Sequence, residues 1–123
     1  MTEIPILKLR SILISSIQTE LTDEEAIKFQ ASLLKRNDKE RTRGIIIDIS
    51  VLDVVDSYMA KVLTDLTLAV KLQGSRVVLC GVQPAVASTL VDMGMDLSGM
   101  KTFLSLDHAF NFLSIEPSRQ LET

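Results

Sequence analysis

One serine in the middle of the sequence is surrounded by acidic residues. Between positions 48 and 65 a single basic residue, Lys61, is outnumbered by the aspartates Asp48, Asp53, Asp56 and Asp65. Ser57 follows Asp56 where a loop enters a predicted helix, and either residue can cap that helix. A serine at a helix start can also accept a phosphate, because the free amides and the helix dipole favour negative charge there. Ser57 is therefore a candidate phosphorylation site.

Other reactive groups are too few for familiar catalytic sites. The chain has one histidine, His108, and one cysteine, Cys80, which argues against a zinc site and against a histidine-based triad. Cys80 lies in an apolar stretch, where a cysteine is usually a small buried hydrophobe, and His108 falls in the first turn of a predicted helix, where we expect a surface position. The glycines match no nucleotide-binding loop. We expect no catalytic residue, no metal ion and no cofactor.

The composition favours one domain that binds other proteins. A chain of 123 residues suits a single domain, and its 46% hydrophobic content and mean hydropathy of +0.27 suggest that some apolar surface meets partners or copies of itself. The 13 basic and 16 acidic residues are intermixed, which argues against a nucleic-acid partner. No apolar run approaches the roughly 18 residues that span a bilayer, and positions 1–5 lack signal-peptide features. We expect a cytoplasmic protein without membrane contact.

The first third of the chain predicts a hairpin and a helix. Residues 4–9 and 11–17 are rich in Ile and Leu and should form two strands. A helix should run from residue 23 to about 37, because Thr22 and Glu25 have the spacing of a capping box. We expect the charged stretch 35–43 to be a solvated helix end and loop. The apolar residues that should cover one face of a sheet are Ile27, Ala31 and Leu34, flanked by Phe29 and Leu33.

The rest of the chain alternates between predicted strands and helices. Residues 44–49 form a continuous apolar run typical of a buried parallel strand. Pro84 suits the first turn of a helix and Gly94 its end. The further predicted elements are a helix over 57–72, a strand over 76–82, a helix over 84–93, a strand over 101–104 and a helix from 105 through 113. This order implies a single α/β domain over residues 1–116, with about four helices on a mostly parallel sheet of four or five strands, and a polar tail over 117–123.

Residues 45–57 resemble the phosphorylation loop of STAS domains, the sulfate-transporter and anti-sigma-factor-antagonist family. Their sequence is Ile-Ile-Ile-Asp-Ile-Ser-Val-Leu-Asp-Val-Val-Asp-Ser, and the resemblance extends over almost the whole chain. The blocks 4–9, 56–63 and 81–87 are similar, more narrowly, to the small antagonist subunits of bacterial stressosomes. Many simpler antagonists carry Asp-Ser-Ser-Gly at this loop, whereas Tyr58 and Met59 follow Ser57 here. That departure fits the stressosome subgroup.

The resemblance implies a protein-binding switch rather than an enzyme. By this resemblance a switch-type protein serine kinase phosphorylates Ser57, the unphosphorylated antagonist sequesters that kinase, and phosphorylation releases it. A serine phosphatase would reverse the modification. The protein would also join a large homo- or hetero-oligomer with paralogous STAS proteins that carry sensory N-terminal domains. The residues expected to contact partners are Asp53, Asp56, Ser57, Tyr58, Gln83 and Pro84.

A phospho-relay protein of receiver type is the main alternative, with Asp48 or Asp53 as the phosphate acceptor. A receiver needs an acidic pair at the end of its first strand to hold magnesium, and a lysine near the end of its last strand. The first predicted strand here ends at Leu9–Arg10, and Lys101 precedes its strand. A regulatory domain of a membrane transporter is a further possibility, but no transmembrane segment is attached.

Overall fold

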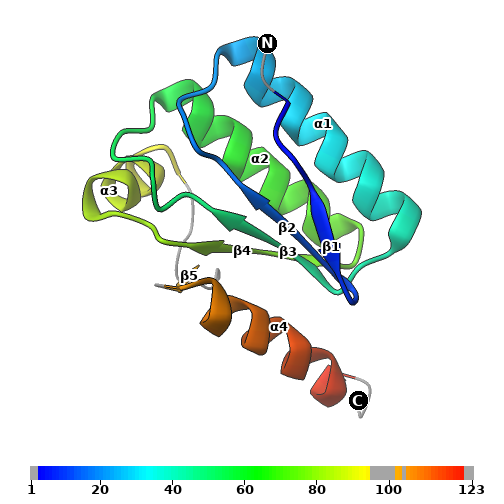
Figure 1. Ribbon diagram of the computed structural model, residues 1–123. Helices are drawn as coiled ribbons and strands as arrows, with labels where there is room; N and C mark the ends of the chain where they lie inside the picture. Colours follow the sequence, from blue (N-terminus) through cyan, green and yellow to red (C-terminus); the bar gives the residue numbers. More distant parts are fainter. Residues whose placement is uncertain (1–2, 95–101, 104, 121–123) are drawn as a thin grey trace.

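A five-stranded sheet forms the centre of the molecule, as Figure 1 shows. The computed structural model describes residues 3–94, 102–103 and 105–120. The strands lie in chain order across the sheet, with β1 antiparallel to β2 and every other pair parallel. The elements are β1 (Leu7–Leu9), β2 (Ile12–Ser16), α1 (Asp23–Glu40), β3 (Gly44–Asp48), α2 (Ser57–Leu72), β4 (Arg76–Cys80), α3 (Pro84–Asp92), β5 (Thr102–Phe103) and α4 (Leu106–Gln120). The predicted α/β fold and its order of elements are confirmed.

Helices cover both faces of the sheet (Figure 1). Helices α1, α2 and α3 enclose the larger hydrophobic core on one face, and α4 covers a smaller core on the other. Strand β3 contributes Ile45 and Ile47 to the larger core and Ile46 to the smaller one. An apolar run without alternation is what a strand buried on both faces requires.

Helix α1 confirms its predicted start but buries a different face from the predicted one. Both hydrogen bonds of the capping box are present, from the Glu25 amide to Thr22 Oγ1 at 3.1 Å and from the Thr22 amide to Glu25 Oε1 at 2.9 Å. The expected stripe is wrong: Ala31 is exposed, Leu34 is half-buried and Ile27 remains 44% exposed. The buried stripe consists of Ala26, Phe29, Leu33 and Asn37. Compared with the predicted orientation, the helix is rotated so that the Phe29 ring lies in the core and the polar Asn37 is buried. Hydrophobic periodicity does not predict a buried polar residue.

The C-terminal elements agree with the prediction where the structure describes them. Strand β5 lies within the predicted stretch 101–104, whose outer residues fall outside the described part of the chain. Helix α4 continues to Gln120 and so includes residues 117–120 of the predicted tail, while 121–123 lie outside the description. The domain boundary at residue 116 stays a prediction. None of the described helices has the length and apolar character needed to cross a bilayer.

A buried polar network joins the ends of α1 and α2. The Asn37 side-chain amide donates to Gln73 Oε1 at 2.7 Å and to Ser75 Oγ at 3.1 Å, and Asn37 Oδ1 accepts from the Thr42 hydroxyl. The Ser75 hydroxyl donates to the Thr42 carbonyl at 2.6 Å. Asn37 and Thr42 are therefore buried within the stretch 35–43, which was expected to be solvated throughout. The network fixes the turns that lead into β3 and β4.

Replacing Asn37 should destabilise the fold. We expect Asn37→Ala to lower the free energy of unfolding by about 1–3 kcal/mol, because the buried hydroxyls of Thr42 and Ser75 and the partly buried Gln73 side chain lose their partner. Asn111→Ala, on the exposed side of α4, is the matched control and should change it by less than about 0.5 kcal/mol. Urea denaturation of both variants measures the difference. Equal stabilities would contradict the role given to the network.

A charged cluster fastens the edge strand β1 to the end of α1. Lys8 Nζ lies 2.8 Å from Glu40 Oε1, and the Arg36 guanidinium pairs with the other carboxylate oxygen. Arg36 Nη1 also donates to the Ile6 carbonyl at 3.4 Å. The hydrogen bonds from Lys8 and then Arg36 lower the pKa of Glu40 from 4.5 to about 2.

The cluster should make stability depend on pH in the acid range. Because the pKa of Glu40 is lowered in the folded chain, its contribution is fully present above about pH 4.5 and is lost as the pH falls toward 2. We expect Glu40→Gln to be less stable than the unaltered protein near neutral pH, with the difference shrinking between pH 4.5 and 2. Urea denaturation across that range is the measurement. Glu24→Gln, which affects an exposed pair with a 4.0 Å separation, serves as control and should show a much smaller change.

Candidate functional site

The loop that carries Ser57 lies at the carboxyl edge of the parallel strands. It covers residues 49–56 and connects the end of β3 to the start of α2. The loop between β4 and α3 leaves the same edge from the neighbouring strand. In α/β proteins this edge commonly carries functional groups, because connecting loops from adjacent strands meet there.

Asp56 caps helix α2, and Ser57 is the first residue of the helix. The Asp56 carboxylate accepts a hydrogen bond from the Met59 amide at 2.8 Å, which decides between the two possible caps. Ser57 is exposed, and its hydroxyl has no hydrogen bond within the described part of the chain. The first turn of α2 contains no acidic residue, and the Asp56 carboxylate that caps it partly offsets the positive end of the helix dipole. A group added to Ser57 would therefore face solvent at the start of a helix.

Hydrogen bonds to both neighbouring segments hold the loop. The Asp48 carboxylate accepts from the Ser50 amide at 2.9 Å, and the Ile49 amide donates to the Cys80 carbonyl at 3.0 Å. The Gln83 side-chain amide donates to the Ser50 carbonyl at 2.9 Å. Gln83 occupies the N-cap position of α3 without capping it through its side chain, so that side chain ties the two loops together.

Gly81 makes this close approach possible. Its φ is 74°, a left-handed conformation that side chains disfavour. A Cβ atom at this position would lie 2.4 Å from the Ser50 Cβ, well inside van der Waals contact. No individual role was predicted for Gly81 from the sequence. Its signal was a glycine directly after a buried strand, which often marks a close backbone approach.

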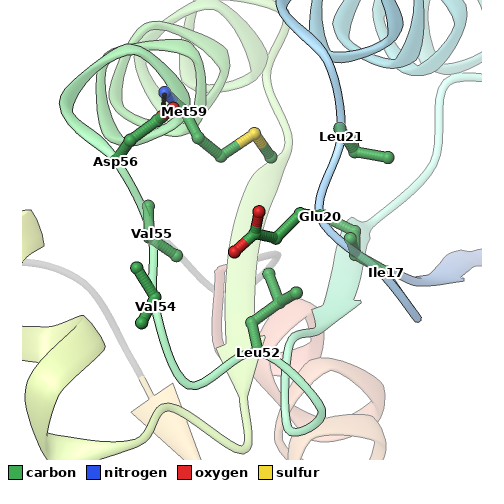
Figure 2. A pocket seen from close by; sticks show the side chains of 8 residues that line it. All are labelled: Ile17, Glu20, Leu21, Leu52, Val54, Val55, Asp56 and Met59. Atoms are coloured by element: carbon green, nitrogen blue, oxygen red, sulfur yellow. Dashed lines mark hydrogen bonds between the residues drawn. The ribbon is translucent and has the colours of Figure 1, made fainter.

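A small pocket separates the loop from the segment between β2 and α1 (Figure 2). Its volume is about 60 Å³, and its lining consists of Ile17, Glu20, Leu21, Leu52, Val54, Val55, Asp56 and Met59. Pockets for small-molecule ligands are usually about 300–1,000 Å³, so this pocket is too small for such a ligand. The contribution of residues 17–21 was not predicted from the sequence, which gave only the strand end at Ile17 and no role for residues 18–21.

The structure gathers most of the predicted contact residues along one edge. Asp53, Asp56, Ser57 and Tyr58 are all exposed on the loop and the first turn of α2. Gln83 is joined to the loop as described, and Pro84 is the first residue of α3.

Asp65 does not belong to this group, although it was counted among the acidic residues around Ser57. It lies further along α2, where its carboxylate is 2.9 Å from Lys61 Nζ. This pairing raises the pKa of Lys61. The negative charge near Ser57 therefore comes from the loop, where Asp53 and Asp56 are exposed.

Cys80 and His108 lie in the kinds of position that the sequence predicted. Cys80 is buried in β4, and burial, with a smaller effect from the charge of Asp48, raises its pKa to about 11. A thiol with such a pKa is a poor nucleophile at neutral pH. His108 is exposed in the first turn of α4. Among the described residues, no group of three His, Cys, Asp or Glu side chains is arranged to hold a metal ion.

Comparison with known proteins gives related curated sequences and solved structures. RsbT co-antagonist protein RsbRA of Bacillus subtilis is 34% identical over 90 residues, which are 73% of this chain and 31% of that protein. The chain thus spans about a third of the length of the curated relatives it matches first. A solved variant of RsbS from Moorella thermoacetica is 37% identical, with a TM-score of 0.87 over 96% of this chain and 99% of that one.

A second solved chain comes from a study of the molecular architecture of the stressosome, described as a signal integration and transduction hub. It is 40% identical, with a TM-score of 0.81 over 89% of this chain and 96% of that one. The family model of the STAS domain matches residues 3–109. Most of the chain, including the Ser57 loop and both neighbouring loops, falls within this match, and the chain therefore belongs to the STAS domain family.

Proposed function

We propose that this protein is a cytoplasmic anti-sigma-factor antagonist and a core subunit of a stressosome-type assembly. It sequesters a switch-type protein serine kinase while Ser57 is unmodified and releases the kinase when Ser57 is phosphorylated. The observation that carries this proposal is the place of Ser57, which is exposed at the start of α2, directly after the residue that caps the helix, and makes no side-chain hydrogen bond to the described residues. The similarity to RsbS and RsbR proteins supports it.

The helix start can carry a phosphate without loss of structure. A phosphoserine adds a charge of about −1.5 to −2 at pH 7, which the amides and dipole at a helix start accommodate. The fold can therefore stay intact while the surface next to Asp53 and Asp56 changes. A local change of this kind acts on binding rather than on folding.

The repulsion that releases the kinase follows from phosphoryl-transfer chemistry. A kinase must bring the phosphates of its nucleotide to the Ser57 hydroxyl before transfer. After transfer, the phosphoserine carries charge of the same sign as the nucleoside diphosphate and the nearby carboxylates. Like charges facing each other across an interface are unfavourable, so the modified antagonist dissociates.

Exposed apolar side chains support assembly with related domains. Leu72 at the end of α2 is 81% exposed, and Leu7 and Leu9 on the edge strand are also exposed. Apolar surface of this kind commonly marks contacts between proteins. We propose paralogous STAS proteins with sensory N-terminal domains as assembly partners, and a serine phosphatase as the enzyme that resets Ser57.

Ser57 should be the principal phosphorylated residue. The protein is incubated with ATP and the switch kinase encoded nearest to it, and mass spectrometry locates the phosphate. Thr64 and Thr67 are internal controls, because their hydroxyls donate to the carbonyls of Ala60 at 2.8 Å and Leu63 at 2.9 Å.

An acid-stable phosphate on Ser57 is the expected result, since phosphoserine survives acid. Modification of Ser50 or a threonine would show that the assigned site is wrong. An acid-labile phosphate on Asp48 or Asp53 would instead favour the receiver alternative.

Substitutions at Ser57 should separate binding from stability. Ser57→Asp should weaken kinase capture about tenfold or more, because a like-charge contact costs on the order of 1 to several kcal/mol. Ser57→Ala should keep capture and prevent release. Both should alter the free energy of unfolding by less than about 0.5 kcal/mol, because Asp56 and not Ser57 caps the helix.

Asp56→Ala is the matched control for the helix cap. It should lower the free energy of unfolding by roughly 0.5–2 kcal/mol, because the Met59 amide loses its acceptor. Thermal melts and kinase pull-downs of the three variants provide the comparison. Tight capture by Ser57→Asp together with loss of capture by Ser57→Ala would refute the charge mechanism.

The protein should associate with itself or with a paralogous STAS domain. Light scattering at micromolar concentration, with and without such a paralogue, measures the mass of the species formed. We expect species larger than a monomer, because the exposed leucines gain from burial between subunits. A monomer that ignores the paralogue would rule out the scaffold role.

A further inference from the structure

The pocket beside Ser57 has walls from two loops that are distant in sequence. Leu52 and Val55 reach it from the loop before α2, and Leu21 reaches it from the segment between β2 and α1. Figure 2 shows the loop before α2 and the segment that carries Leu21 on opposite sides of the pocket, with the Met59 side chain extending from α2 between them. Leu52, Val55 and Met59 also belong to the larger core, so the apolar side of the pocket is formed by packed core residues.

The rim of the pocket carries an exposed valine on one side and the Glu20 carboxylate on the other. Val54 lines the pocket and remains 58% exposed, which leaves its methyl groups available for contact. Glu20 extends its carboxylate over the pocket from the opposite loop (Figure 2). Within residues 3–94, 102–103 and 105–120, the Glu20 carboxylate has neither a hydrogen bond nor an ion pair.

The size and charge of the pocket indicate what can occupy it. A volume of about 60 Å³ suits one aliphatic side chain. The unpaired Glu20 favours a basic residue next to that side chain, because opposite charges across an interface select partner and orientation. An aliphatic residue beside an arginine or lysine on a protein surface combines both features.

We propose that this pocket anchors the kinase through one aliphatic side chain, with an adjacent basic residue of the kinase paired to Glu20. The inference rests on the proposed function and extends the contact surface to the loop between β2 and α1. The anchor and Ser57 then form two parts of one interface. Phosphorylation at Ser57 releases the kinase, while the anchor contacts position the Ser57 hydroxyl for phosphoryl transfer.

Methyl NMR can observe the anchor directly. The protein is labelled with ¹³C at its methionine methyl groups, and unlabelled switch kinase is added with ADP, so that binding occurs without phosphorylation. Met59 lines the pocket, whereas Met93 is an exposed methionine at the end of α3 and serves as an internal control. Met59→Leu and Met93→Leu assign the two signals. We expect a clear chemical-shift change at Met59 and little change at Met93.

Two exposed substitutions test the contacts separately. Glu20→Lys should weaken kinase binding about tenfold or more, and Val54→Ala should weaken it several-fold. The matched controls are Asp38→Lys on the exposed side of α1 and Val91→Ala near the exposed end of α3, which should bind within twofold of the unaltered protein. Thermal melts verify that all four variants fold.

The results distinguish this inference from the proposed function. If the unaltered protein fails to bind the kinase, the proposed function and the anchor fall together. If it binds, while both pocket variants match their controls and the Met59 signal stays in place, the anchor alone is refuted. Weaker binding of both pocket variants with a shifted Met59 signal supports it.

Discussion

The position of Ser57 depends on the contact between the backbone at Ser50 and Gly81. Because Gly81 has no side chain, the loop after β3 can lie against the end of β4 and bond to it. The Gln83 side chain then closes the junction by donating to the Ser50 carbonyl. A larger residue at Gly81 would displace the loop, and Ser57 would move with it. The position of the candidate site therefore requires both a residue without a side chain at Gly81 and the hydrogen bonds that fix the loop.

This contact connects the fold to the proposed switch. The sheet fixes the ends of β3 and β4, the junction fixes the loop, and the Asp56 cap fixes the first turn of α2. Ser57 adds no bond of its own within the described residues, so its modification leaves these supports in place. Ser57 is therefore well suited to signalling by phosphorylation, because the added charge changes the surface potential and leaves the surrounding backbone structure unchanged.

The sequence predicted the elements well and the relations between them less well. Strand β3 and helix α2 were predictable, because an unbroken apolar run and a capped helical pattern are local signals. The buried face of α1 was predicted wrongly, because Asn37 is polar and its partners Gln73 and Ser75 come from the distant turn between α2 and β4. The contribution of Glu20 was missed because it depends on two loops meeting across the sheet edge, which no local pattern records.

The polar network at Asn37 lies where α1 and α2 end, whereas the Ser57 loop lies where α2 begins. The polar residues that stabilise the fold are therefore separated, by the length of α2, from the exposed residues proposed to contact partners. Exposed positions such as Glu20, Val54 and Tyr58 can change without disturbing that network. Distant sites of this kind contribute to stability almost additively. After gene duplication, paralogous copies of such a domain can consequently acquire different partner specificities while keeping the same thermal stability.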